Sequence, residues 1–335
     1  MRPIAKKVLD KMSVKLKLFA LISTIPFVVA CSSGDAVSTS ELASQGLYSA
    51  DISDDAKSSI VGSIQHGGSL WSNQTNERRF NWNHAKAEFT PLISVDIDPS
   101  GQYAITGGAR TLVLWNTLTG QSEGFWNTPG DIKSLAASND GDFALVGLDD
   151  QTARYFDVKN GGIKQTLRTG AVVRTVSLDK SGTLAVTGDD NYNVTLWDIK
   201  SGEQLHKWQL SNRIANVTLS LDGKYVFAAA QLGTAKIWSA NTGEVVSEIS
   251  TGGLTSRNIT YSKAKFSADN RQILVGGINS SVKLLNILTG DTLKSWTLNK
   301  KDKLRPTGSS VLAVAFGSND KYYAIGSNGL LNILK

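Results

Sequence analysis

The chain has 335 residues, of which 41% are hydrophobic and 19% charged, with a formal net charge of +6. Six of the 35 basic residues and one of the 29 acidic residues lie in the first 30 positions, so the rest of the chain is nearly neutral. A nearly neutral body lacks the basic surface that counterion release from nucleic acid requires. Composition therefore excludes nucleic acid as the favoured partner.

Residues 1–30 have the composition of a targeting segment rather than of a folded domain. A basic stretch precedes an apolar run over residues 16–29, which is too short to span a bilayer as a permanent helix. The segment from Met12 onward makes a complete signal by itself, so translation could start at Met1 or at Met12.

The apolar run ends in Val28-Val29-Ala30-Cys31, which resembles the lipobox of bacterial lipoproteins. The resemblance implies that a signal peptide over residues 1–30 is removed and that Cys31, the only cysteine, carries the lipid. Ser32 in the following position implies sorting to the outer membrane. An ordinary secretory signal with an incidental cysteine is the alternative.

The stretch 178–208 contains one complete repeating unit. Alternating apolar residues over 183–187, 194–199 and 203–208 predict three β-strands after a strand that ends at Leu178. Gly182 and Gly202 lie in the turns between them, where tight hairpins need glycine. Four strands bury too little apolar surface to be stable alone, so the unit should stack on copies of itself.

Seven copies of this unit follow one another at intervals of 40 to 50 residues. An apolar residue ends the first strand of each copy, at Ile52, Ile97, Ala137, Leu178, Leu219, Phe266 and Phe316. A small residue follows ten positions later, at Gly62, Gly107, Gly147, Gly188, Ala229, Gly276 and Gly326. Seven four-stranded repeats of this period predict an all-β, seven-bladed β-propeller over residues 37–335.

The endings of several third strands resemble those of WD repeats. These endings are Leu196-Trp197-Asp198, Leu114-Trp115-Asn116 and Ile237-Trp238-Ser239. The histidine that WD repeats place before the first strand is expected to be missing, and Asp150 alone fills the aspartate position of the following turn. The pyrroloquinoline and surface-layer types of propeller repeat remain alternatives.

No catalytic or metal-binding constellation is evident in the sequence. His66, His84 and His206 do not share metal-ligand spacing, and we expect each to lie at the surface. The aspartates that recur near the first hairpins fit turn chemistry, and the regularly spaced tryptophans should pack blade on blade. The sequence therefore predicts a protein that is not an enzyme and uses neither a cofactor nor a metal.

The lengths of the turns predict which face of the propeller binds a partner. The turns between first and second strands and between third and fourth strands are constant in length, and we call their side the short-turn face. The other side, the long-loop face, carries the second-to-third turns and the connections between blades. Every length change falls on the long-loop face, in the connections 83–92, 251–263 and 298–310. Insertions confined to one face commonly mark a binding surface.

The sequence thus favours a membrane-anchored, periplasmic protein-interaction scaffold of unknown oligomeric state. The candidate partner-binding residues are Lys86, Phe89, Arg257, Tyr261, Lys300, Lys301, Lys303 and Arg305. A propeller that binds or hydrolyses a ligand in its central channel is the alternative. Lys133 and Arg174, at equivalent positions of adjacent blades, would then form an anion site at the channel mouth.

The seventh repeat ends at Lys335 without a fourth strand, and an open edge is a feature that propellers avoid. Residues 31–36 read as a lipidated tether, whereas residues 37–42 are available to form the missing strand. We therefore expect residues 37–42 to close the ring as the outer strand of blade 7. This strand should start on the short-turn face, which would place that face near the bilayer.

Overall fold

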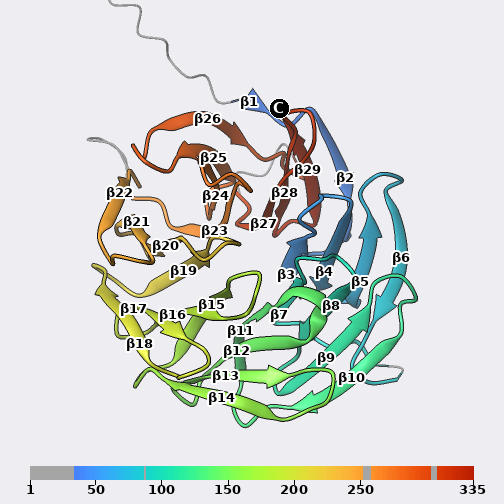
Figure 1. The fold of residues 1–335 in the computed structure, drawn as a ribbon. Helices are drawn as coiled ribbons and strands as arrows, with labels where there is room; N and C mark the ends of the chain where they lie inside the picture. Colours follow the sequence, from blue (N-terminus) through green and yellow to red (C-terminus); the bar gives the residue numbers. More distant parts are fainter. Residues whose placement is uncertain (1–33, 87, 252–257, 303–307) are drawn as a thin grey trace, which may run out of the picture. The chain divides into compact units, whose positions relative to one another are not determined.

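The alternating stretches of each repeat form antiparallel strands that pair in the order in which they follow one another along the chain. The computed structural model describes residues 34–86, 88–251, 258–302 and 308–335. Within these residues, seven sheets surround a central channel (Figure 1). We number the sheets as blades 1 to 7 in chain order, beginning with the one that starts at β3. The prediction of a seven-bladed β-propeller is confirmed.

Each blade contributes its first strand to the channel wall and its fourth strand to the outer rim. The first strands are β3 (Leu47–Ile52), β7 (Ser94–Ile97), β11 (Ile132–Ala137), β15 (Val173–Leu178), β19 (Ile214–Leu219), β23 (Tyr261–Phe266) and β27 (Val311–Phe316). The second strands are β4 (Ser58–Ser63), β8 (Tyr103–Gly107), β12 (Phe143–Leu148), β16 (Leu184–Asp189), β20 (Tyr225–Ala230), β24 (Gln272–Gly277) and β28 (Tyr322–Gly326).

The outer half of each blade consists of the third and fourth strands. The third strands are β5 (Gly67–Ser72), β9 (Thr111–Asn116), β13 (Thr152–Asp157), β17 (Asn193–Asp198), β21 (Ala235–Ser239), β25 (Ser281–Asn286) and β29 (Leu330–Leu334). The fourth strands of blades 1 to 6 are β6 (Glu77–Trp82), β10 (Ser122–Asn127), β14 (Ile163–Arg168), β18 (Gln204–Gln209), β22 (Val245–Ile249) and β26 (Thr292–Thr297). A short 3-10 helix, η1 (Asn139–Gly141), lies in the first turn of blade 3.

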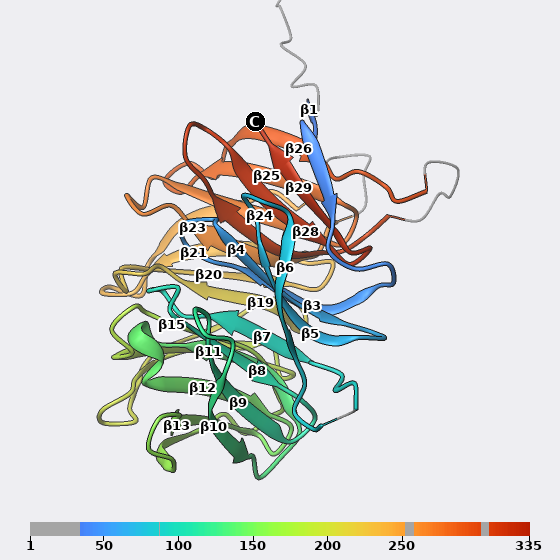
Figure 2. The ribbon, with the colours of Figure 1, turned by 90° about the vertical axis from the view of Figure 1, so that its right-hand side faces the viewer.

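The N-terminal segment closes the ring, as the sequence predicts. Strand β2 (Ser38–Glu41) pairs antiparallel with β29 and supplies the fourth strand of blade 7. Ser38 pairs with Ile333 near the end of β29, so β2 begins on the short-turn face. Residues 34–35, within the stretch that the sequence indicated as a tether, form the two-residue strand β1 (Gly34–Asp35) parallel to β26. Figures 1 and 2 both show β1 beside the C-terminus.

Glycines and tryptophans at repeated positions join neighbouring blades. A Cβ atom on Gly188 would lie 2.4 Å from Cγ2 of Ile214 in the next blade, which explains the small residue near the end of each second strand. Trp82 and Trp208, from fourth strands, each donate a hydrogen bond from Nε1 to a turn carbonyl of the following blade. Trp82 also stacks on Trp115 of blade 2, with ring centroids 5.1 Å apart. The predicted blade-on-blade packing of the tryptophans is confirmed.

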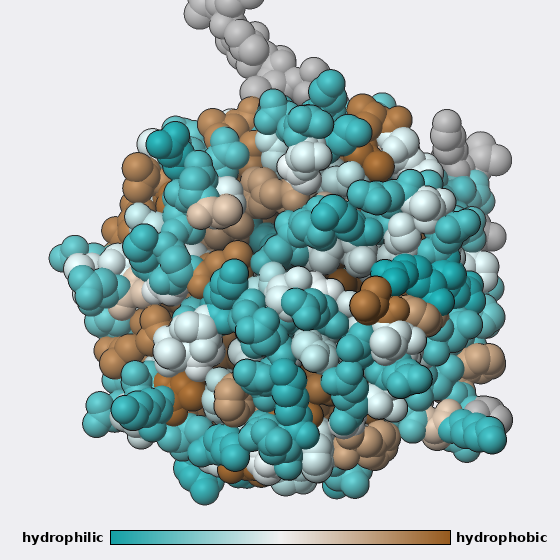
Figure 3. Space-filling view, turned by 45° about the vertical axis from the view of Figure 1, so that its right-hand side comes forward, coloured by the Kyte–Doolittle hydropathy of each residue, from teal (hydrophilic) through white to brown (hydrophobic). Residues whose placement is uncertain are grey.

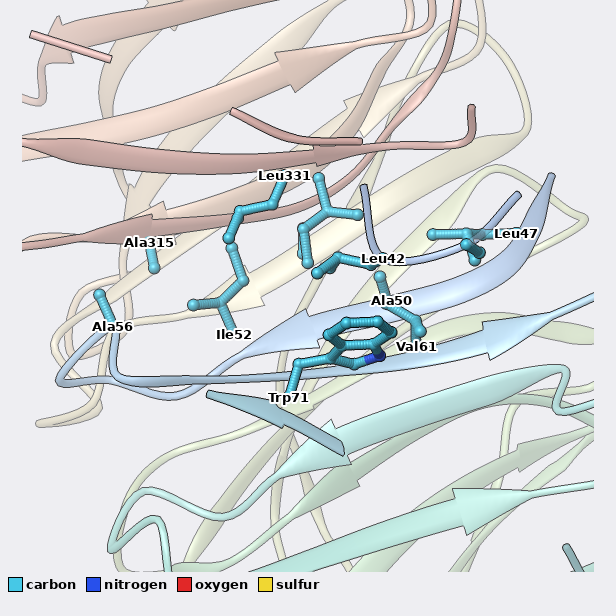
Figure 4. Close-up of a cluster of buried hydrophobic side chains, with 12 residues drawn as sticks. Leu42, Leu47, Ala50, Ile52, Ala56, Val61, Trp71, Ala315 and Leu331 are labelled. Atoms are coloured by element: carbon cyan, nitrogen blue, oxygen red, sulfur yellow. The ribbon is translucent and has the colours of Figure 1, made fainter. Parts of the chain in front are cut away.

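The hydrophobic core lies between blades, whereas the surface is mixed. In the oblique view of Figure 3, hydrophobic residues form separate patches among hydrophilic ones. One buried cluster joins blade 7 to blade 1 and includes Leu42, Ile52, Ala315 and Leu331 (Figure 4). Leu42 is 3% exposed and directly follows β2, so the ring-closing segment is held by core packing as well as by strand pairing.

Candidate functional site

The long-loop face is the candidate interaction surface. Figure 2 shows that the connection after β6 and the connection after β26 leave the ring on one side, opposite the turn that follows β11. Four of the predicted partner-binding residues are exposed there: Lys86 and Phe89 between blades 1 and 2, and Lys300 and Lys301 between blades 6 and 7. Phe89 is 66% exposed, and its ring meets that of His66 edge to face at 5.8 Å.

Lys301 also makes contacts within the chain. Its Nζ lies 2.8 Å from Oε1 of Glu41 and donates hydrogen bonds to the carbonyl oxygens of Ala43 and Ser44, at 2.9 and 2.7 Å. The side chain therefore fastens the end of β2 to the connection between blades 6 and 7.

Tyr261 is not a surface residue, which corrects its assignment as a partner contact. It begins β23 and is fully buried, and its hydroxyl donates a hydrogen bond to the carbonyl of Ser250 at 2.9 Å. Burial raises the pKa of Tyr261 to about 12. The other three predicted contacts, Arg257, Lys303 and Arg305, lie outside the described residues.

A group of exposed apolar side chains on blades 1 and 2 includes Phe89, which the sequence analysis predicted as a contact, and three residues that it missed. It consists of Tyr48, Ile64, Phe89 and Ile93, which are 47%, 47%, 66% and 38% exposed. A hydrogen bond of 2.7 Å from Ser49 Oγ to the carbonyl of Leu92 joins the two backbones beside Tyr48 and Ile93. We call these four residues the blade 1 patch.

The parts of the blade 1 patch come from three separate segments of the chain. Ile64 and His66 lie in the same second-to-third turn of blade 1, and His66 contacts Phe89 from the following connection. The sequence pattern that could have indicated the blade 1 patch was the presence of four apolar residues among the polar residues of turns and strand starts. The sequence could not show that these segments contact one another.

β-Bulges present one side chain of most first strands at the channel mouth. The pairing register shifts between residues 47 and 49 in blade 1, between 132 and 134 in blade 3, and between 173 and 175 in blade 4. The intervening residues are Tyr48, Lys133 and Arg174, and all three line the channel cavity. Bulges reorient side chains in this way, so the predicted placement of Lys133 and Arg174 at the mouth is confirmed.

Arg174 is already paired with a carboxylate, however. Its Nε and Nη2 donate to the two oxygens of Asp190 at 2.9 and 2.8 Å, and Nε of Arg213 lies 3.0 Å from the same carboxylate. The hydrogen bond from Arg174 lowers the pKa of Asp190. The predicted anion site formed by Arg174 and Lys133 is therefore not supported, because its stronger hydrogen-bond donor is occupied.

Below the mouth, the channel is a polar cavity of about 280 Å³. Asp51 and Asp96 line it from equivalent positions of β3 and β7, and Lys263 and Lys265 line it from β23. Lys265 reaches across blade 7, where the equivalent residue is the small Ala315, and its Nζ lies 2.5 Å from Oδ1 of Asp54.

His84 is half-buried and belongs to a hydrogen-bonded network. Its Nε2 lies 2.7 Å from Oγ1 of Thr106, and its Nδ1 lies 2.5 Å from Oγ1 of Thr111. Nε1 of Trp115 donates to the same Thr106 oxygen at 2.8 Å. Burial lowers the pKa of His84 to about 4. The connection before the first strand of blade 2 therefore contains a histidine that is hydrogen-bonded to that blade's second and third strands.

The described residues contain no group of three or more His, Cys, Asp or Glu side chains that could hold a metal ion. In the same part of the chain, no helix has the length and apolar character needed to cross a membrane.

No protein-family model matches the chain, and no curated protein sequence matches it. The arrangement of seven blades of four antiparallel strands, one of them extended by β1, defines the described part of the chain as a seven-bladed β-propeller. The resemblances to WD repeats and to bacterial lipoproteins remain predictions from the sequence.

Proposed function

We propose that this protein is a non-catalytic interaction scaffold, tethered to the outer membrane by a lipid on Cys31 and facing the periplasm. In this proposal a partner protein binds the long-loop face. The observation that carries the proposal is the blade 1 patch, which exposes four large apolar side chains on the face that contains the length changes. Apolar side chains gathered on an exposed surface commonly mark protein-binding sites.

The chemistry around the patch indicates the kind of partner. Lys86 is exposed in the same connection as Phe89, and Tyr48 offers a hydroxyl beside its apolar ring. Aromatic residues surrounded by polar groups are typical of the centre of a protein interface. The partner surface should therefore present apolar side chains with carboxylates at their edge.

The double variant Ile64→Ser, Phe89→Ser tests the proposed interface. Affinity purification from detergent-solubilised envelopes would identify a partner, and its affinity for each purified variant would then be measured. We expect the double variant to bind at least about tenfold more weakly, because loss of a central interface residue costs about 2 kcal/mol or more.

The matched control is Leu118→Ser, Leu288→Ser, since these residues are 76% and 64% exposed in turns of the short-turn face. The control should bind the partner as the wild type does. Loss of binding in the control, with wild-type binding by the patch variant, would place the interface on the opposite face.

Cys31→Ser tests the membrane anchor. The lipid chains on one cysteine together give stable anchoring, whereas the apolar run before it is too short to span a bilayer. We expect the variant to be found as soluble protein or as uncleaved precursor when cells are fractionated. Recovery of a mature variant in the outer-membrane fraction would refute lipidation at Cys31.

The direction of the ring-closing strand supports an orientation on the membrane. Strand β2 begins beside the end of β29, on the short-turn face. We propose that the short-turn face lies nearer the bilayer and that the blade 1 patch is presented to the periplasm.

A further inference from the structure

We propose that the central channel binds a small organic ammonium ion between the carboxylates of Asp51 and Asp96. This site is separate from the blade 1 patch, and it adds a small-molecule ligand to the proposed scaffold. The proposal rests on the free carboxylate oxygens, on what the ring itself requires at these positions, and on the balance of charges in the channel.

Each carboxylate uses one oxygen to hold the next blade. Oδ2 of Asp51 accepts a hydrogen bond from the backbone N–H of Ile97 at 3.0 Å, and Oδ2 of Asp96 accepts one from Ala137 at 2.8 Å. Among the described residues, no hydrogen bond reaches Oδ1 of either aspartate. Every fully buried side-chain polar atom there has a partner, so the two Oδ1 atoms face the open cavity.

The ring does not need carboxylates at these positions. In blade 4 the equivalent residue is Ser177, whose Oγ accepts the corresponding hydrogen bond from Leu219 at 3.1 Å. Blades 3 and 7 have alanines there, Ala136 and Ala315. Two neighbouring carboxylates in a cavity wall cost desolvation and mutual repulsion, so a purely structural role does not explain them.

The channel below its mouth has one carboxylate more than it has ammonium groups. Three carboxylates, Asp51, Asp54 and Asp96, face two lysines, Lys263 and Lys265. Asp54 is matched by the ion pair with Lys265.

The cations at the mouth lie near other carboxylates, outside the deeper layer. Arg174 is held by Asp190, and Lys133 acts on Asp131, which is also paired with Arg110. An added cation would therefore balance the deeper layer of the channel.

The excess carboxylate is felt most by Asp96. Burial, and next the charge of Asp51, raise the pKa of Asp96 well above its usual value, while Lys263 and Lys265 act in the opposite direction. An ammonium ion between the two Oδ1 atoms would offset the repulsion between the two carboxylates and lower this pKa. Binding should therefore favour the release of any proton that Asp96 holds.

An ammonium ion fits the oxygen atoms of Asp51 and Asp96 better than a metal ion does. Two carboxylates flanked by lysines do not form a group of three or more acidic, histidine or cysteine ligands, and the described residues contain no such group. An N–H donor needs only directed acceptors, which the two Oδ1 atoms supply. The ligand should therefore be recognised by its N–H groups as well as by its charge.

Titration calorimetry of the full-length protein in detergent tests the site, with ethylammonium chloride as the probe. We expect saturable binding that releases up to one proton per ligand, measured at pH 7 in buffers of different ionisation enthalpy. Asp51→Ser and Asp96→Ser each keep an acceptor of the kind found in blade 4. Each should weaken binding at least tenfold, and Asp96→Ser should also abolish proton release.

Two comparisons make the outcome specific. Tetramethylammonium chloride has the same charge without N–H groups and should bind at least tenfold more weakly. Asp269→Asn, in an exposed turn of the short-turn face, should bind ethylammonium as the wild type does. The proposal is overturned if ethylammonium shows no saturable binding, if folded Asp51→Ser and Asp96→Ser proteins bind it normally, or if tetramethylammonium or magnesium chloride binds equally well.

Discussion

Deletion of residues 34–42 is expected to lower the free energy of unfolding by about 4 kcal/mol or more, because it removes a buried leucine together with a strand. Leu42 is 3% exposed within the cluster that joins blades 7 and 1, and β2 pairs with β29 along four residues. The deletion also leaves β29 as an open edge. Denaturant titration of the purified deletion variant, compared with the full chain, measures the effect.

Two single substitutions keep this prediction testable if the deletion variant does not fold. Leu42→Ala should cost about 2 to 5 kcal/mol, the range for leucines truncated in a core. Val37→Ala is the matched control and should change stability by less than about 0.5 kcal/mol, because Val37 is 61% exposed. If the deletion variant, Leu42→Ala and Val37→Ala are all as stable as the wild type, the N-terminal segment does not close the ring.

Acidification from pH 7 to pH 4 is expected to destabilise the protein through His84 by about 3 kcal/mol. The pKa of His84 is lowered to about 4 by burial, whereas an unfolded histidine titrates near 6.5. Below pH 6.5 the unfolded chain therefore binds a proton that the folded chain does not. Stability should fall from about pH 6.5 and level off below the folded pKa.

The His84→Gln variant isolates this effect because glutamine cannot titrate. We expect the variant to be less stable than the wild type at pH 7, where the bonds to Thr106 and Thr111 are altered. Its stability should then fall less steeply with acid. His66→Gln removes an exposed histidine and should keep the wild-type dependence. Denaturant midpoints measured at several pH values compare the three proteins, and parallel curves would contradict the assignment to His84.

The sequence could predict the strands and the ring because both depend on local patterns. A strand alternates with a period of two residues, and a tight turn requires a particular backbone conformation. Gly202 has φ +75° in the third-to-fourth turn of blade 4, and Asn76 has φ +58° at the equivalent place in blade 1. The missing strand of blade 7 could be predicted because an unpaired edge is unfavourable wherever it occurs.

The roles of individual side chains depended on residues far away in the chain. Lys301 and Tyr261 were both predicted to contact a partner. Lys301 is exposed, but its acceptors lie at residues 41–44, and Tyr261 is buried among residues of two blades. His84 is hydrogen-bonded to Thr106 and Thr111, which its own loop does not contain. Sequence spacing does not report such partners.

The sequence by itself therefore determined the architecture of this protein, the closing strand and the face with long connections. Only the tertiary structure decided which side chains are free to bind, among them the blade 1 patch and the open oxygens of Asp51 and Asp96. The physical reason is that strand formation follows from neighbours within a few residues. Exposure and charge pairing follow instead from contacts that exist only once seven blades have closed into a ring.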